Sequence, residues 1–229
     1  MTDAERSPVA LAIPGHEELK TFQRAHRDHF PEGMALRVHR GLSWLDRANQ
    51  CDDQDGRFVF LWIAFNAAYA QNLSGLGRTS EPERIQQFFT KLESLDDNQR
   101  LYELVWQRYA GPIRNLLNNK YVYQPFWDSL NHDEPDCDWE ARFSSYRKAA
   151  NAALAAVDTP RLLSIVFQAL YTLRNQIVHG GATWNGRVNR PQISLGNEIL
   201  ADIVPIALDL MMRHPDTLWG DALYPVVER

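Results

Sequence analysis

The chain contains few cysteines, no long apolar run and no recognisable secretory signal. Its 229 residues include two cysteines, Cys51 and Cys137, which are too few for a disulfide scaffold and fit a reducing compartment. No apolar run approaches the roughly 18 residues that a membrane-spanning helix needs. The N-terminus lacks the charged start and apolar stretch of a secretory signal. These absences predict a cytoplasmic protein without membrane contact.

An excess of basic charge is also missing. The chain has 24 Lys and Arg against 29 Asp and Glu, and this formal net charge of −5 excludes a polybasic nucleic-acid-binding protein. Seven Trp, eight Tyr and ten Phe supply core-building side chains, which excludes a disordered chain. The composition therefore predicts a folded domain whose core needs neither disulfides nor metal ions.

Helical periodicity dominates the sequence, and no alternating strand pattern extends beyond a few residues. We therefore predict an all-α fold, with a flexible segment over residues 1–15 and a single domain over residues 16–229. The segment 57–73 is apolar nearly all round, which predicts a buried central helix. Gly111-Pro112 is expected to break the chain between two helices.

Two helices are predicted near the C-terminus, on either side of a polar loop. The first covers residues 160–179 and is expected to end at Gly180-Gly181, a strong C-terminal stop signal. The second covers residues 192–213 and contains Pro205, which predicts a kink.

The segment from Thr159 to Asn197 contains no Asp or Glu. An uncompensated basic segment in an otherwise acidic chain is where an anionic ligand would bind. A buried helix that excludes acids would explain residues 162–173, but it does not explain the polar loop that follows. The segment carries one histidine and four arginines: His179, Arg161, Arg174, Arg187 and Arg190.

The sequence from Arg174 to His179, Arg-Asn-Gln-Ile-Val-His, resembles the signature motif of the HEPN family, an arginine followed by a polar residue and then a histidine. The surrounding LRNQIVHGGATWNGRVNR is similar to larger bacterial HEPN proteins of abortive-infection and other defence systems. The resemblance implies an up-and-down helical bundle with a helical N-terminal extension and the motif in residues 159–214. It also implies a metal-independent ribonuclease that works as a homodimer with a composite active site and needs no cofactor.

A second arginine and histidine with the same spacing, Arg24 and His29, serve as an internal comparison. Ala25 follows this arginine in place of a polar residue, and the segment is predicted to be an exposed amphipathic helix. We interpret this copy as a surface segment. Sequence context, and not the spacing, therefore distinguishes the two copies.

The chemistry of RNA cleavage explains why Arg174, Asn175 and His179 are the candidate catalytic residues. RNA carries its own nucleophile, the 2′-hydroxyl group, and histidine can serve as its general acid or base near neutral pH. Arginine can hold the charged phosphorane. A spacing of five residues separates the two side chains by about 140° around a helix. Either the last turn loosens, so that His179 turns toward Arg174, or a symmetric dimer pairs two motifs.

Other candidates have open interpretations. Three residues after the motif are predicted to contact the phosphate backbone of RNA: Arg187, Asn189 and Arg190. The alternative is that they belong to a solvated loop without a ligand. Asn66 either forms a hydrogen bond to a neighbouring helix or reaches the cleft of the candidate RNA site. Trp184 either packs on the helical bundle or stacks on an RNA base. The histidines and cysteines match no metal-ligand spacing, so no metal site is predicted.

We expect a metal-independent endoribonuclease of bacterial defence or of a toxin-like stress response. RNA, a second copy of the chain and a regulatory or antitoxin protein are the expected partners. Two alternatives remain: a non-catalytic HEPN-like dimer that binds RNA, a nucleotide or a protein, and a helical scaffold in which the motif holds the dimer together.

Overall fold

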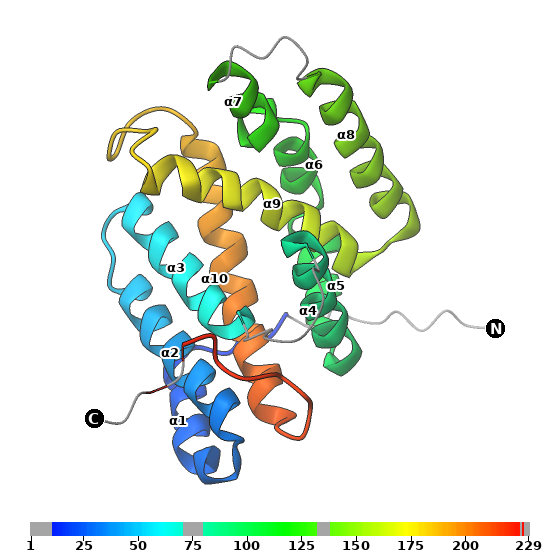
Figure 1. Cartoon of the computed structure of the whole chain (residues 1–229). Coiled ribbons are helices and arrows are strands. Elements are labelled where there is room, and N and C mark those ends of the chain that lie inside the picture. The colour runs from blue at the N-terminus through cyan, green and yellow to red at the C-terminus, as the bar shows by residue number, and fades with distance from the viewer. Residues whose placement is uncertain (1–10, 71–79, 132–137, 225, 227–229) are drawn as a thin grey trace, which may run out of the picture.

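The structure, a computed structural model, describes residues 11–70, 80–131, 138–224 and 226 (Figure 1). The described part contains no β-strand, and the predicted all-α fold is confirmed. A 3₁₀ turn follows the first helix, and another precedes the seventh. The helices are α1 (His16–His26), α2 (Glu32–Asn49), α3 (Gln54–Tyr69), α4 (Glu81–Leu95), α5 (Arg100–Glu103), α6 (Ala110–Leu117), α7 (Gln124–Asn131), α8 (Trp139–Ala156), α9 (Thr159–Val178) and α10 (Arg190–Arg213).

Helix α3 lies at the centre of the core. The side chain of Asp53 caps its first turn by accepting the N–H of Gly56 at 2.7 Å. Phe58, Leu61 and Phe65 are completely buried. The helix packs against α2, α9 and α10 (Figure 1), which confirms the predicted buried central helix. A helix in this position is apolar on nearly every side, because none of its residues after Gln54 is fully exposed; the side with Phe60, Ile63 and Asn66 is half-buried.

Helix α9 begins and ends at strong sequence signals. The Asp158 side chain accepts the N–H of Arg161 at 3.1 Å, and Pro160 occupies the first turn, where a missing N–H costs nothing. The helix ends at Val178, and Gly180 follows with a φ of 72°, a conformation that favours glycine. The predicted end of the helix at the Gly-Gly pair is therefore confirmed.

Helix α10 starts two residues earlier than expected and runs to Arg213 with Pro205 in its interior. It starts at Arg190 because Asn189 adopts a left-handed conformation and Pro191 fits the first turn. The loop between the two helices, here called the 179–189 loop, is correspondingly short.

The break predicted at Gly111-Pro112 is wrong in its position. Both residues lie in the first turn of α6, and the chain changes direction at Tyr109, one residue before that helix. Proline is well accommodated in a first turn, so the pair begins the helix instead of separating it from its predecessor. The preceding segment, Leu104–Arg108, forms a π-helical turn.

The N-terminal helices belong to the same core as the rest of the chain. Helix α1 packs against α2 and α10, and Leu11 and Ile13 lie against the core ahead of it. The expected flexible segment covers residues 1–15, of which residues 1–10 lie outside the described part. What the sequence suggests as an N-terminal extension thus contributes directly to the central packing.

A buried arginine joins α2 to the end of α3 and to the C-terminal segment. The Arg37 guanidinium donates to the carbonyl groups of Ala68 and Tyr69, and also to those of Trp219 and Gly220. Burial lowers the pKa of Arg37 to about 10, which still leaves the group charged at neutral pH. These bonds satisfy carbonyls that the end of α3 would otherwise leave unpaired.

The contact between α10 and its neighbours allows a test of packing. A Cβ atom on Gly196 would lie 2.5 Å from the Phe58 ring and 3.1 Å from a Leu170 methyl group, both in the core. Gly196→Ala should therefore lower the free energy of unfolding by about 1–3 kcal/mol, as overpacked cores do. Urea unfolding followed by circular dichroism measures this change.

Gly111→Ala is the matched control, because nothing lies within 4 Å of the added atom. It should leave stability unchanged or raise it slightly, through the better helix propensity of alanine. Equal stability of the two variants would contradict the proposed close packing of α10.

Candidate functional site at the end of helix α9

The motif residues lie at the C-terminal end of α9. Arg174 and Asn175 occupy its last turns and are half-buried, whereas His179 is the first residue after the helix and is exposed. The His179 N–H still donates to the carbonyl of Asn175 at 2.9 Å, so the helical pattern continues as far as the histidine. Within the described residues, the imidazole has no hydrogen-bond or ion-pair partner. It is open to solvent and to any molecule that docks at this end.

Arg174 and His179 leave the helix on different sides, about 140° apart, because the helical pattern continues as far as the histidine. The Nη1 of Arg174 donates to Asn175 Oδ1 at 3.0 Å, and the arginine forms no ion pair with a carboxylate of the described part. Asn175 therefore orients the arginine. Arg174 lines a neighbouring pocket, and His179 does not. One chain thus does not bring the two ends of the motif together.

The 179–189 loop is held by two acidic residues at the start of α3. Asp55, which is buried, forms an ion pair with Arg190 and accepts the backbone N–H of Asn185 at 2.7 Å. Asp53 accepts the indole N–H of Trp184 at 3.3 Å. The Trp184 ring is nevertheless 74% exposed, so it does not pack into the bundle of a single chain.

The three predicted RNA-binding residues have different surroundings. Arg187 is exposed and has no partner among the described residues. Asn189 donates to Gln176 Oε1 at 2.6 Å, and Gln176 in turn donates to the carbonyl of Tyr121 at 2.8 Å. Arg190 is occupied by Asp55. Only Arg187 therefore has its whole hydrogen-bonding capacity available for a ligand.

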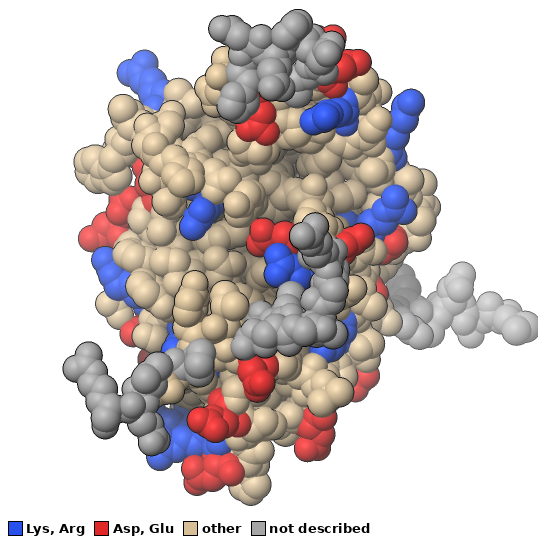
Figure 2. Space-filling view, viewed as in Figure 1, with Lys and Arg blue, Asp and Glu red and all other residues tan. Residues whose placement is uncertain are grey.

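The positive charge of the acid-free segment is spread out. Arg161 lies at the opposite end of α9, thirteen residues and about 20 Å from Arg174. Arg190 is neutralised by its partner. On the face shown in Figure 2, basic and acidic side chains are interspersed without a large area of one sign. The segment does not form a single cationic surface.

A pocket of about 670 Å³ beside Arg174 contains the residues that sequence reasoning missed. Arg40 and Arg84 line it, together with Asn66, whose side chain has no hydrogen-bond partner in the described part. Arg40 donates to the carbonyl of Tyr224 at 2.6 Å, and the Nε of Arg84 is buried and unpartnered there. Of the two interpretations of Asn66, the structure favours the one in which it reaches a cleft.

An aromatic hydroxyl belongs to the same pocket, here called the Arg174 pocket. Burial raises the pKa of Tyr69 to about 12, with smaller opposing effects of Arg84 and Glu81, so this phenol stays protonated at neutral pH. The pocket thus combines guanidinium groups from three helices with a neutral hydroxyl and an amide. No local spacing could have indicated this set, because its members are far apart in the sequence.

Comparisons with known proteins add no assignment: no protein-family model, curated protein or solved structure matches the chain. Within the described ranges, no three His, Cys, Asp or Glu side chains are grouped closely enough to hold a metal ion. None of the described helices combines the length and apolar character needed to cross a membrane.

The loop contacts allow a second test. Asp55→Asn removes a buried charge that balances Arg190, and it should lower the free energy of unfolding by about 3–5 kcal/mol. It should also speed tryptic cleavage after Arg187, because the loop loses its anchor. Limited proteolysis with mass spectrometry measures the second effect. Asp52→Asn, an exposed neighbour, is the control. Identical cleavage rates in the two variants would show that Asp55 does not hold the loop.

Proposed function

We propose that this chain is a metal-independent endoribonuclease of the HEPN type. One observation supports the proposal above the others: the motif ends an all-α core helix with Arg174 unpaired by any described carboxylate and His179 open to solvent. An arginine already held by an acid would have little capacity left for a phosphate group. The copy at Arg24 and His29 also has exposed side chains, but it lies at the surface end of the amphipathic helix α1, whereas Arg174 is half-buried on a helix whose other residues are mostly in the core.

The proposed reaction needs one proton-transferring group and one anion-binding group. The RNA 2′-oxygen attacks the adjacent phosphorus while the bond from phosphorus to the 5′-oxygen breaks. The products are a 2′,3′-cyclic phosphate and a 5′-hydroxyl end. His179 takes the 2′-hydroxyl proton or supplies one to the leaving oxygen. Arg174 stabilises the charge of the phosphorane.

A homodimer would place an arginine beside a histidine, which the single chain does not do. Arg174 and His179 diverge within one copy, so the partner subunit's His179 would complete the site beside Arg174. Exposed apolar side chains at the end of α9 and in the loop after it support a contact here: Val178 is 48%, Val188 62% and Trp184 74% exposed. Apolar surface of this kind next to a site is typical of an interface. In a two-fold dimer, each of two equivalent sites would contain one residue from each chain.

The biological setting follows only from the resemblance. It favours a bacterial, cytoplasmic protein of antiviral defence or a toxin-like stress response, controlled by a regulatory or antitoxin protein. The net charge of −5 supports this proposal in one respect, because an acidic body disfavours indiscriminate binding of RNA.

The second candidate function is a dimer that binds RNA, a nucleotide or a protein without cleaving RNA. It is favoured by the divergence of Arg174 and His179 and by the use of Asn189 and Arg190 within the fold. In that case RNA binding survives His179→Ala, weakens with Arg187→Ala, and is accompanied by no cleavage in the unaltered protein.

Cleavage without metal tests the proposed enzyme directly. His179→Ala should reduce cleavage of single-stranded RNA in excess EDTA by about 10²–10⁴-fold, the usual contribution of a general acid or base. Mass spectrometry should find cyclic phosphate ends on the products. His29→Ala is the matched control and should cleave at the normal rate. Absence of cleavage by the unaltered protein, or equal rates for all three proteins, argues against the proposal.

A complementation experiment tests the composite site. Arg174→Ala and His179→Ala carry different affinity tags, are co-expressed, and are purified by both tags in turn. A site built from two chains leaves one of two sites intact, so the mixed dimer should regain about half the normal activity. Each variant alone should be inactive. An inactive mixed dimer, or failure to isolate one, would contradict the composite arrangement.

A further inference from the structure

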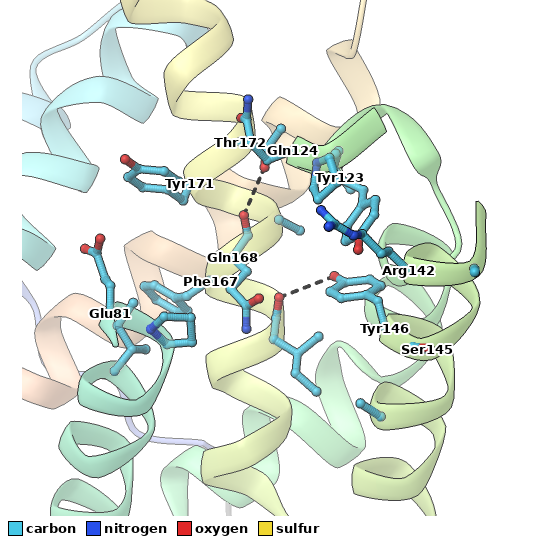
Figure 3. A pocket seen from close by; sticks show the side chains of 18 residues that line it. Glu81, Tyr123, Gln124, Arg142, Ser145, Tyr146, Phe167, Gln168, Tyr171 and Thr172 are labelled. Carbon is cyan, nitrogen blue, oxygen red and sulfur yellow. Dashed lines mark hydrogen bonds between the residues drawn. The ribbon is translucent and has the colours of Figure 1, made fainter. Parts of the chain in front are cut away.

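A second cavity, of about 770 Å³, lies between α4, α8 and α9 (Figure 3). Its volume falls within the range of small-molecule binding sites. Buried apolar side chains form much of its wall, among them Ile85 of α4, and Ile165 and Phe167 of α9. His179 and Arg174 do not line it, so it is separate from the site proposed for RNA cleavage.

The cavity exists because α8 packs loosely on its neighbours. Of the eighteen residues of α8, the buried ones are Ala150 and Ala153, both in its C-terminal half. In the other half, Tyr146 spans the gap, and its hydroxyl donates to the carbonyl of Ile165 at 3.4 Å. Such a bond is long for a hydroxyl donor. The wall therefore contains a hydroxyl group that a better-placed acceptor could recruit.

Two charged side chains lie on opposite sides of the cavity. Figure 3 shows Arg142 of α8 on one side and Glu81 of α4 on the other. Arg142 is exposed and forms no ion pair with an acidic side chain of the described part. A guanidinium group is the preferred partner of a carboxylate, which it binds through two parallel hydrogen bonds. The carboxylate of Glu81 would repel an anion, so the two ends of the cavity differ.

We propose that this cavity binds a small amphipathic carboxylate, with its charged group on Arg142 and its apolar body against Ile85, Ile165 and Phe167. The volume sets the size of the ligand, and the apolar wall sets the nature of its body. Arg142, which no acidic side chain of the described part pairs with, sets the sign of its charge. Glu81 fixes the orientation, because the opposite placement would bring two carboxylates together. This inference does not depend on the proposed nuclease activity.

Decanoate is a suitable probe, and decanol and decylammonium are its uncharged and cationic counterparts. Isothermal titration with the full-length protein should detect saturable binding of one decanoate per chain. Decanol should bind about tenfold more weakly, and so should decanoate to Arg142→Gln, since each loses a charge-assisted bond. Arg147→Gln changes the net charge equally on the same helix, outside the cavity, and should bind decanoate normally.

A second pair of variants tests the location. Ser145→Trp places a large side chain at the cavity wall and should abolish decanoate binding, whereas Ser144→Trp, exposed and outside the cavity, should not. Circular dichroism melting verifies that both variants fold. Equal decanoate binding by these two variants, tighter binding of decylammonium than of decanoate, or absence of saturable decanoate binding would each overturn the proposal.

Discussion

The buried carboxylate of Asp55 joins three parts of the chain that the candidate site depends on. It lies in the first turn of α3, pairs with Arg190 at the start of α10, and accepts the N–H of Asn185 in the 179–189 loop. A buried carboxylate is stable only when such partners compensate for its lost hydration. The same contacts fix the course of the 179–189 loop after α9 ends, and hence where Trp184 and Arg187 leave the surface.

The ion pair between Asp55 and Arg190 also shows how part of the charge of the acid-free segment is used within the fold. A stretch with four arginines and no acid suggests a ligand, yet the acid that pairs with Arg190 comes from a segment 135 residues earlier. The positive charge of this segment has no acidic neighbour in the sequence, but in the folded chain part of it is compensated by Asp55. Three arginines are left without a described carboxylate partner: Arg161 at the start of α9, and Arg174 and Arg187, which precede and follow His179 in the sequence.

Local signals made much of the fold predictable. The buried helix α3, the capped start of α9 and its end at Gly180 follow from periodicity, side-chain capping and backbone conformation, which act within a few residues. The position of the motif at a helix end could be predicted for the same reason. The Gly111-Pro112 error shows the limit, since the same pair can precede a helix or begin one. The choice depends on what the helix packs against.

The arrangement of the site could not be predicted, because it depends on contacts between distant segments. Arg40, Arg84 and Asn66 meet beside Arg174 only through the packing of α2, α3, α4 and α9. The orientation of the Arg174 side chain depends on its bond to Asn175. The angle between Arg174 and His179 on a helix left two arrangements open, a loosened last turn or a symmetric dimer, and did not decide between them. Sequence spacing fixes an angle between two side chains, but it does not show which of them finds a partner.

In the proposed composite site, Arg174 and His179 differ in how firmly one chain holds them. Most side chains from Thr159 to Leu173 are buried, so Arg174 stands on a firmly anchored helix. His179 follows the last turn, and among the described residues its ring finds no hydrogen bond or ion pair that would fix it. A catalytic pair needs both members held within a fraction of an ångström. The exposed apolar side chains of Val178 and the 179–189 loop would supply that constraint only when another surface covers them. In such a protein, assembly and not substrate binding alone would determine when the site becomes active.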